Sequence, residues 1–377
     1  MKIIEVTNVD FSLKHFLVPL MLALQSEGHD VLGVCADGAL LHGVSAQGLR
    51  IETVPLPRSL SPRANWRALW ALVALFKRER PDLVHAHMPI SGFLARLAAR
   101  IAGVPRVAYT CHGFLFNQPG PLWRRALGLA IEWLGGRLTD ITLTVSAEEA
   151  ADARRLHIAR NATPVGNGRD PAIFHPNPEA RARIRAELGV PIDRVVVIIV
   201  SRLVRHKGYP ELLAAMEHVP GAELWVVGSR LPSDHGPELE PLFAASPLGC
   251  RLRRLGTRTD IPDILAAADI FTLPSHFEGL PMSIIEAMLT GLPVVATAIR
   301  GPRELVLPNE TGLLVPPAAP GPLAAALQRL VGDPVLRREM GNAAMTRAAT
   351  LYAEAAVLRR TMALLTQAAP TLARERA

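Results

Sequence analysis

The chain has 377 residues, which is too long for one typical hydrophobic core and therefore predicts two domains. Hydrophobic residues make up 49% of it and charged residues 20%, a composition that excludes an intrinsically disordered protein. Of the formal charge of +7, +5 falls in residues 1–177 (19 Lys and Arg against 14 Asp and Glu). We therefore expect either an anionic partner or a solvated basic surface in this half.

Strand-like and helix-like segments alternate along the first half. The expected strands are 2–9, 31–36, 51–57, 80–87, 106–113 and 141–149, and the expected helices are 16–26, 65–80, 90–105 and 125–140. Repeated strand–helix–strand units with short turns indicate a parallel sheet covered by helices on both faces. Residues 1–165 are therefore predicted to form one Rossmann-like α/β domain.

The alternation stops at residues 166–178, where Gly, Asn and Pro are crowded as in an interdomain linker. It then restarts, with expected strands at 194–203, 222–229, 251–257, 270–275 and 293–298. Residues 179–349 are predicted to form a second Rossmann-like domain, and 350–377 a helical tail that packs back on the first. Two such domains create a cleft, and ligands of α/β sheets bind beyond the carboxyl ends of the strands.

Cysteine usage and the lack of targeting signals bear on the compartment. Cys35, Cys111 and Cys250 are odd in number and widely spaced, which suggests neither disulfides nor a metal cluster, and so a reducing compartment. The first residues resemble a strand and lack the features of a signal peptide, and no apolar run is long enough to cross a bilayer. We expect a cytoplasmic protein or one peripheral on the inner face of the membrane.

The segment SHFEGLPMSIIEAMLTGLPVVAT, residues 275–297, places two acids around a tight turn that opens an apolar helix. Pro281 suits the first helical turn, Glu278 precedes the helix, and Glu286 lies one to two turns inside it. The amides around Gly279 and Leu280 lie near a positive helix terminus, which suits a phosphate or sugar oxygen. Both carboxylates can then face one polyol ligand. The alternative is that Glu278 stabilises the helix terminus and Glu286 is solvated.

Two cations, Arg202 and Lys207, follow the expected strand 194–203 and precede a helix. At the carboxyl end of a strand they suit a diphosphate, because Arg binds oxygens as a fork and Lys adds a point charge. A plain basic surface loop is the alternative. The chain has neither a P-loop motif nor a Gly-x-Gly-x-x-Gly after a strand, which argues against a dinucleotide dehydrogenase.

His112 follows a strand of the first domain and precedes Gly113, so it is placed to face the expected cleft. A lone histidine is more often structural than catalytic. No Asp-x-Asp occurs, and no His/Cys pair has the spacing of metal ligands, so we expect no metal site and no cofactor.

Taken together, these segments resemble the retaining glycosyltransferases of family 4, which have the GT-B fold of two Rossmann-like domains facing across a cleft. The stretch EGLPMSIIE resembles that family's Glu-x7-Glu motif, SRLVRHKG its diphosphate segment, and TCHG its first-domain His-Gly. The similarity runs in the same order over nearly the whole chain. It implies a metal-independent retaining hexosyltransferase that moves a hexose or N-acetylhexosamine from a nucleotide-diphosphate sugar, with UDP preferred over GDP.

The resemblance also implies a role for each site residue. Arg202 and Lys207 would hold the diphosphate and stabilise the leaving group, and His112 would reach the sugar from the first domain. Glu286 would bind the ribose hydroxyls and Glu278 the donor sugar. The amides of Gly279 and Leu280 would cradle the sugar and the β-phosphate. In this family the leaving phosphate itself helps to deprotonate the acceptor, and cations take the place of a metal.

One departure from the family pattern concerns the turn after the first strand. Many relatives carry Gly-Gly there, where this chain has Phe11 and Ser12. Glycine permits close backbone approach to a ligand, so this contact of the family is not carried over to Phe11 and Ser12. Asp10, Ser12 and Lys14 are candidates for contacting the acceptor instead.

The first half resembles most the branch that extends sugars linked to a lipid diphosphate, which implies a glycan or polyprenyl-diphosphate-linked acceptor. Tryptophans occur there among basic residues, as at an anionic membrane interface; they are Trp66, Trp70, Trp123 and Trp133, with Arg63, Arg67, Lys77, Arg78, Arg124 and Arg125. The alternative is that the tryptophans are core and the arginines solvated, with a soluble acceptor.

Three other functions compete with transfer. A nucleotide-sugar epimerase or phosphorylase of the same fold would need the same contacts, and release of free sugar would distinguish it. The sequence pI of about 9.9 suggests a nucleic-acid-binding protein as an alternative. However, the basic residues are scattered and no recognition motif occurs, so we expect no nucleic-acid partner. An inactive scaffold would not need both pairs, Glu278 with Glu286 and Arg202 with Lys207.

Overall fold

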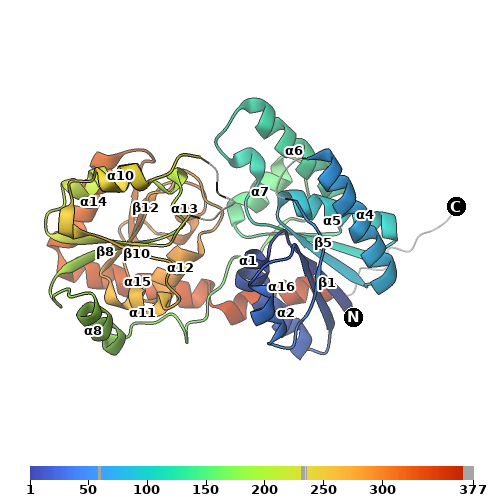
Figure 1. The fold of residues 1–377 in the computed structure, drawn as a ribbon, viewed down its shortest axis with the longest axis horizontal. Helices are drawn as coiled ribbons and strands as arrows, with labels where there is room; N and C mark the ends of the chain where they lie inside the picture. Colours follow the sequence, from blue (N-terminus) through green and yellow to red (C-terminus); the bar gives the residue numbers. More distant parts are fainter. Residues whose placement is uncertain (58–60, 231–233, 235, 368–377) are drawn as a thin grey trace. The chain divides into compact units, whose positions relative to one another are not determined.

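The computed structural model describes residues 1–57, 61–230, 234 and 236–367. They form two compact units, of which unit 1 comprises Met1–Gly166 and the C-terminal segment from Val357, and unit 2 comprises Asn167–Ala356. In each unit helices cover a sheet, as Figure 1 shows. Of the predicted tail, residues 350–356 belong to unit 2 and residues 357–367 to unit 1, and residues 368–377 fall outside the described part of the chain.

Unit 1 contains a seven-stranded parallel sheet in the order β3-β2-β1-β4-β5-β6-β7. Its strands are β1 (Lys2–Val6), β2 (Asp30–Cys35), β3 (Arg50–Thr53), β4 (Leu83–His87), β5 (Arg106–Cys111), β6 (Ile141–Thr144) and β7 (Thr163–Pro164). Its helices are α1 (Asp10–Ser12), the π-helix η1 (Leu13–Leu17), α2 (Val18–Ser26), α3 (Leu41–Ser45), α4 (Pro62–Glu79), α5 (Pro89–Ala102), the 3₁₀-helix η2 (Leu115–Asn117), α6 (Leu122–Arg137), α7 (Ala147–Arg155) and most of α16 (Glu354–Thr366).

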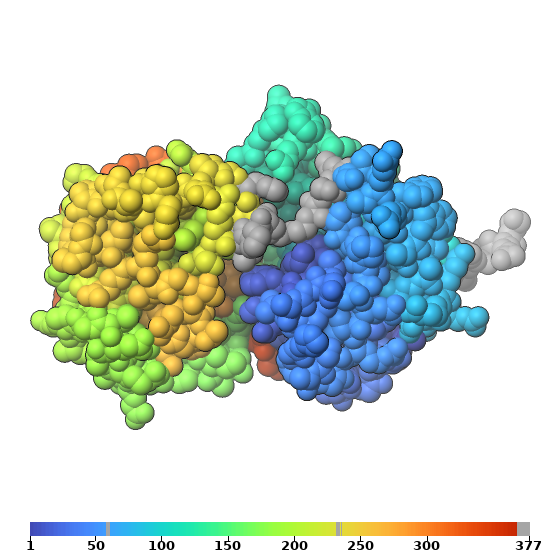
Figure 2. Space-filling model, viewed as in Figure 1, coloured from blue at the N-terminus to red at the C-terminus, as the bar shows by residue number. Residues whose placement is uncertain are grey.

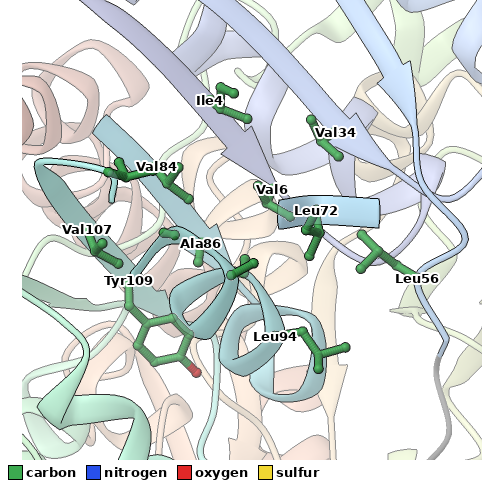
Figure 3. Close-up of a cluster of buried hydrophobic side chains, with 14 of the residues drawn as sticks. Ile4, Val6, Val34, Leu56, Leu72, Val84, Ala86, Leu94, Val107 and Tyr109 are labelled. Carbon is green, nitrogen blue, oxygen red and sulfur yellow. The ribbon is translucent and has the colours of Figure 1, made fainter. Parts of the chain in front are cut away.

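The two faces of this sheet carry separate apolar clusters, because side chains alternate along a strand. Ile4 and Val6 of β1 belong to the cluster beneath α4 and α5, part of which Figure 3 draws. Ile3 belongs to the other cluster, with residues of α2 and α16. Glu5 shares the face of Ile3 and is completely buried, so a carboxylate lies at the carboxyl end of this layer.

The first helical segment starts earlier than the sequence suggests. We expected a helix from Phe16, but α1 begins at Asp10 and η1 continues it into α2. Polar residues among the first positions mask the apolar periodicity there. The π-turn brings Phe16 to 5.9 Å from His112, measured between ring centroids, so this helical start lies against the edge where β5 ends.

Unit 2 contains a six-stranded parallel sheet in the order β10-β9-β8-β11-β12-β13. Its strands are β8 (Val195–Val200), β9 (Ala222–Val227), β10 (Leu252–Gly256), β11 (Ile270–Leu273), β12 (Val294–Thr297) and β13 (Gly312–Val315). Its helices are α8 (Pro178–Glu187), η3 (Arg205–Lys207), α9 (Tyr209–Glu217), α10 (Glu240–Ala244), η4 (Gly249–Arg251), α11 (Ile261–Ala267), α12 (Met282–Leu289), α13 (Pro302–Leu305), α14 (Pro320–Gly332) and α15 (Pro334–Leu351). The predicted pair of Rossmann-like parallel-sheet domains is confirmed.

No helix in the described part of the chain combines the length and the apolar character needed to cross a bilayer.

Candidate functional site

The loops after β8, β11 and β12 lie side by side at the carboxyl edge of the unit 2 sheet, because these strands are neighbours. The backbones of these loops approach one another closely. A Cβ on Gly208 would lie 2.0 Å from the carbonyl oxygen of Pro274, and one on Gly301 would lie 1.8 Å from that of Gly279. Both glycines also have φ near +80°, a conformation that other residues rarely adopt. The loops after β8 and β11 carry five of the residues that the sequence proposed for the donor, namely Arg202, Lys207, Glu278, Gly279 and Leu280.

Lys207 and Glu278 meet at this edge. Glu278 Oε1 accepts a hydrogen bond from Lys207 Nζ at 2.6 Å and another from Ser275 Oγ at 2.7 Å. The two charged side chains are 14% and 9% exposed, so the pair is mostly withdrawn from water. Lys207 follows β8 and Glu278 follows β11; the topology therefore brings two of the predicted residues into direct contact.

Helix α12 starts after Pro281, which occupies the N-cap position and not the first helical turn as the sequence suggested. Before it, the amides of Gly279 and Leu280 donate to no acceptor among the described residues. The Leu280 carbonyl, in contrast, accepts from Asn167 Nδ2 at 2.7 Å. The turn is therefore anchored through a carbonyl group, while its two amides stay available to a ligand.

Glu286 lies within α12 and is buried. Its Oε1 accepts a hydrogen bond from Arg169 Nε at 2.6 Å. Arg169 belongs to the predicted linker, and its backbone pairs with Tyr352 and Glu354 on the segment that leads into α16. The alternative of a solvated Glu286 is therefore wrong, and the linker supplies its partner.

Arg202 follows β8 and forms an ion pair with Asp234. The Arg202 side chain is 40% exposed, whereas that of Asp234 is 3% exposed. His206 precedes Lys207 in this loop, and its pKa is lowered by burial and by the positive charges of Lys207 and Arg202. An anionic ligand at this loop would meet two cations and a neutral imidazole.

His112 of unit 1 takes part in a buried chain of polar side chains. His112 Nε2 lies 3.1 Å from His87 Nδ1, and His87 Nε2 lies 2.8 Å from Glu5 Oε2. His85 Nδ1 lies 3.0 Å from Glu5 Oε1, and its Nε2 lies 2.8 Å from Thr110 Oγ1. Three strands contribute these residues, so His112 is not the isolated histidine that the sequence suggested.

The three acceptor-side candidates have different surroundings. The Asp10 carboxylate accepts from the amides of Phe11 at 2.7 Å and Leu40 at 3.2 Å, so it fastens the loop after β2. Ser12 is buried, and Lys14 is half-buried on η1. Their role toward an acceptor stays a prediction.

Several residues of interest escaped the sequence argument. Glu5, His85 and His87 bring three potential metal-ligand atoms within 4.8 Å of one another, a cluster that the search for ligand spacing overlooked. The alternate-residue motif His85-x-His87 on a strand was its only signal. The buried Thr7 hydroxyl and Asn8 side-chain oxygen, just after β1, have no hydrogen-bond partner among the described residues.

The tryptophans of unit 1 lie at the surface. Trp66 and Trp70 of α4 are 62% and 44% exposed, and Trp123 and Trp133 of α6 are 67% and 41% exposed. Both helices reach the molecular surface in Figure 2. The alternative that these four tryptophans form core is therefore wrong; that role belongs to Trp225 of unit 2, which is completely buried.

Comparisons with known proteins identify the family. The family description "Glycosyltransferase Family 4" matches residues 16–173, and "Glycosyl transferases group 1" matches residues 180–347. The chain is 31% identical over 326 residues to UDP-Gal:alpha-D-GlcNAc-diphosphoundecaprenol alpha-1,3-galactosyltransferase of Escherichia coli, covering 83% of each chain. It is 32% identical over 297 residues to D-inositol 3-phosphate glycosyltransferase of Kineococcus radiotolerans, covering 71% of this chain and 67% of that one.

Solved structures give the same fold. Sucrose-phosphate synthase from Thermosynechococcus elongatus superposes with a TM-score of 0.83 at 23% identity, over 97% of this chain and 98% of that one. Anabaena HepE in complex with UDP and glucose superposes with a TM-score of 0.82 at 22% identity, over 98% of this chain and 100% of that one. The fold is thus GT-B, and the protein is a glycosyltransferase. The chain belongs to glycosyltransferase family 4, whose two matched regions correspond to the two units.

Proposed function

We propose that this glycosyltransferase moves a hexose or N-acetylhexosamine from a UDP-sugar to a lipid-diphosphate-linked glycan, with retention of the anomeric configuration and without a metal. The observation that carries this proposal is the grouping at the unit 2 sheet edge. There the Lys207–Glu278 pair lies beside the available amides of Gly279 and Leu280, and Arg202 follows the same strand as Lys207. This set combines cations for a diphosphate with acceptors for sugar hydroxyls.

The cations account for leaving-group departure. In the proposed step the bond between the sugar C1 and the β-phosphate oxygen breaks with its electron pair, giving UDP. The acceptor hydroxyl oxygen forms the new bond to C1 from the same face, and its proton goes to the departing phosphate. Arg202 and Lys207 stabilise the charge that develops on the diphosphate. In the complex, Arg202 binds both Asp234 and the diphosphate, and Lys207 binds both Glu278 and the diphosphate.

The remaining residues bind and orient the donor. Glu286, held by Arg169, accepts hydrogen bonds from the ribose hydroxyls through the oxygen that Arg169 Nε does not occupy. Glu278 binds the donor sugar, and His112 of unit 1 contacts it. Carboxylates whose rotamers are fixed by a neighbour lose little entropy when they bind a polyol, which is the advantage of this arrangement.

Two relatives support the choice of substrates. The similar protein of Escherichia coli is named for UDP-galactose as donor and a diphosphoundecaprenol-linked sugar as acceptor, and HepE was solved with UDP and glucose. We therefore place UDP before GDP and a lipid-linked acceptor before a soluble one.

A thermal-shift panel tests the donor. The full chain is heated with UDP, GDP, ADP and their sugars, in chelator and again with Mg²⁺ or Mn²⁺. A ligand at a hundred times its dissociation constant adds about 2.7 kcal/mol of stability. We expect a UDP compound to stabilise the wild type equally with and without metal, and Glu286→Gln to lose most of the effect.

The matched control is Glu310→Gln, which removes an exposed acid from the same unit. It should retain the full shift. If no nucleotide stabilises the protein, or if both variants behave alike, the donor site is wrongly assigned. A shift that requires metal would contradict the metal-free mechanism. Conversion of the donor to another sugar, or release of free sugar, would indicate an epimerase or phosphorylase, and the anomeric coupling of the product decides retention.

We also propose that α4 and α6 bind the anionic inner surface of a membrane, where a lipid-linked acceptor would be presented. Trp123, Leu127 and Leu134 recur along α6 at helical spacing, and all three are exposed, as is the neighbouring Arg124. On α4, Trp66 and Trp70 lie with ring centroids 5.6 Å apart, next to the exposed Arg67. Apolar side chains flanked by arginine suit a lipid interface.

A further inference from the structure

The polar chain that ends at His112 is fixed by strand register. Strand β1 pairs with β4 so that Glu5 lies opposite His85, and β4 pairs with β5 so that His87 lies opposite Thr110. All four side chains therefore project from the same face of the sheet. His112 comes directly after β5, and its Nε2 reaches His87 Nδ1 at 3.1 Å.

Counting the hydrogen atoms on these side chains gives the donor and the acceptor of each hydrogen bond between them. Glu5 offers only acceptors when ionised, so His85 Nδ1 and His87 Nε2 must both carry the hydrogen that points toward it. In a neutral imidazole the other nitrogen is an acceptor. His85 Nε2 therefore accepts from the Thr110 hydroxyl, and His87 Nδ1 accepts from His112 Nε2. His112 is then the Nε2–H tautomer, with a lone pair on Nδ1.

The ionisation states agree with this count. Burial raises the pKa of Glu5, but the contacts with His85 and His87 outweigh it and lower the pKa to about 2. Burial, and secondarily electrostatic repulsion by the neighbouring His85, lower the pKa of His87 to about 4. Burial, then His87 and His85, lower the pKa of His112 to about 3. At neutral pH the carboxylate is charged and these two rings are neutral.

We propose that Glu5 and His87 are positioning residues that hold His112 as the Nε2–H tautomer, so that its Nδ1 accepts a hydrogen bond from a hydroxyl of the donor sugar. The claim about the tautomer of His112 concerns the protein alone, and the claim about the sugar contact rests on the proposed function. A ring fixed in one tautomer can accept at Nδ1 but cannot donate there. The consequence is specificity for a sugar that bears a hydroxyl at that position, because an analogue without it leaves the ring nitrogen unsatisfied.

A metal ion on Glu5, His85 and His87 is the competing arrangement, and it predicts the opposite tautomer. A ligand nitrogen cannot carry a hydrogen, so metal-bound His87 Nε2 would place the hydrogen on Nδ1. His87 would then donate to His112 Nε2, and His112 would be the Nδ1–H tautomer. We favour the hydrogen-bonded arrangement because an ionised Glu5 already satisfies both rings, at 2.8 and 3.0 Å.

Nitrogen NMR of the full chain, labelled with ¹⁵N-histidine and without ligand, separates the two. The chain has 12 histidines, so His112 is assigned as the signal set lost in His112→Asn. We expect one protonated Nε2 and one unprotonated Nδ1, unchanged between about pH 5 and 8. The titratable group that faces this ring is His87 of β4, with His85 and Glu5 beyond it in the hydrogen-bonded chain; from η1 the ring meets Phe16, and Lys14 and His15 belong to the same π-helix. An Nδ1–H signal, averaged tautomers, or metal in equimolar amount in the purified protein would overturn the proposal.

Two substitutions of His87 form a matched pair. His87→Asn keeps an oxygen acceptor near the position of Nδ1, whereas His87→Gln keeps an amide donor near the position of Nε2. We expect His112 to keep its tautomer in the Asn variant and to show mixed tautomers in the Gln variant. A purely structural role would make the two variants alike. Because the wild-type spectrum is itself a test, the proposal does not depend on either variant folding.

The sugar contact needs a separate measurement, made with the donor found by the thermal-shift panel. Each deoxy analogue of that donor is compared in wild type and in His87→Gln. We expect one position at which the wild type loses at least about tenfold in kcat/KM and the variant loses much less. Equal discrimination by the two proteins would refute this half while the tautomer result stands. If no nucleotide sugar binds at all, it is the proposed function that fails.

Discussion

Lys207 and Glu278 form an ion pair whose side chains are only 14% and 9% exposed. Removing one partner of such a pair leaves a poorly solvated charge, which costs about 3–5 kcal/mol. We expect Lys207→Met to lower the free energy of unfolding of unit 2 by about 3 kcal/mol. The double variant Lys207→Met/Glu278→Gln should recover part of this loss because no charge remains. Hydrogen exchange in urea, read separately for each unit, gives the free energies.

The control for this cycle is the exposed pair Arg183–Asp263, with side chains 58% and 31% exposed. Such surface pairs contribute about 0–1 kcal/mol, so Arg183→Met should have little effect. Additive losses in the double variant would show that Lys207 and Glu278 do not interact energetically in the free protein.

The low pKa values of His87 and His112 predict that unit 1 loses stability in acid. His87 and His112 have native pKa values of about 4 and about 3, below the ordinary value near 6.5, so only the unfolded chain takes up their protons between these limits. The contribution of these rings to the free energy of unfolding should therefore be fully present above about pH 6.5. Below that pH it should decrease by roughly 1.4 kcal/mol per pH unit for each ring. The Glu5 carboxylate, with its pKa lowered to about 2, adds a further loss below about pH 4.5.

Urea unfolding from pH 7 to 4.5, followed by hydrogen exchange in unit 1, measures this slope. His112→Asn should reduce the slope by the contribution of one ring. His42→Asn, which removes an exposed histidine of the same unit, should leave the slope unchanged. A flat profile in the wild type would show that these rings already carry protons in the native state.

The sequence predicted four charged residues for the donor but few of the partners that the structure gives them. Glu278, Glu286, Arg202 and Lys207 follow strands, and position after a strand can be estimated from periodicity. Arg169, which holds Glu286, lies in the linker, 117 positions away. No local pattern predicts such a contact, because it depends on where the linker crosses helix α12.

At the scale of the secondary-structure elements, the alternation of strands and helices could be predicted from the sequence. The order of the strands was not, and the Glu5–His85–His87 cluster depends on it. Strand β1 pairs with β4 and not only with β2, so residues 80 positions apart share one hydrogen bond. The π-turn of η1 was also missed, since it differs from an α-helix by one residue in its hydrogen bonding and not in composition.

Helix α16 provides a test of how the C-terminal segment contributes to unit 1. Leu365 is completely buried and belongs to the cluster that contains Ile3 and Leu83. Leu365→Ala removes buried apolar atoms and leaves a cavity, which costs about 2–5 kcal/mol. We expect faster hydrogen exchange in β1 and β4 of the variant, with unit 2 unaffected.

The control for α16 is Arg359→Ala, an exposed change on the same helix that should be neutral within about 0.5 kcal/mol. If Leu365→Ala instead weakens protection in both units equally, the two unfold as one cooperative body, and stability cannot be assigned to either alone.

At the scale of the whole molecule, charge and apolar exposure coincide in unit 1. Its sequence has a net charge of +8 (22 Lys and Arg against 14 Asp and Glu) and that of unit 2 a net of −1 (19 against 20), and the tryptophans of α4 and α6 are exposed in unit 1. If these helices bind lipid, vesicles containing phosphatidylglycerol should sediment the full chain, and phosphatidylcholine vesicles should do so less. Raising the salt from about 0.1 to about 1 M shortens the Debye length from about 10 to about 3 Å, so binding should weaken without vanishing, because the apolar part remains.

Substitutions separate the two contributions to lipid binding. Trp123→Ser/Leu127→Ser removes part of the apolar stripe on α6 and should reduce binding at both salt concentrations. Arg124→Gln should reduce it only at low salt, since screening already removes its contribution at high salt. Ile192→Ser is the matched control, because Ile192 is 62% exposed but belongs to unit 2. Equal losses in the control would show that any exposed apolar residue serves, and no sedimentation of the wild type would leave the acceptor to be sought in solution.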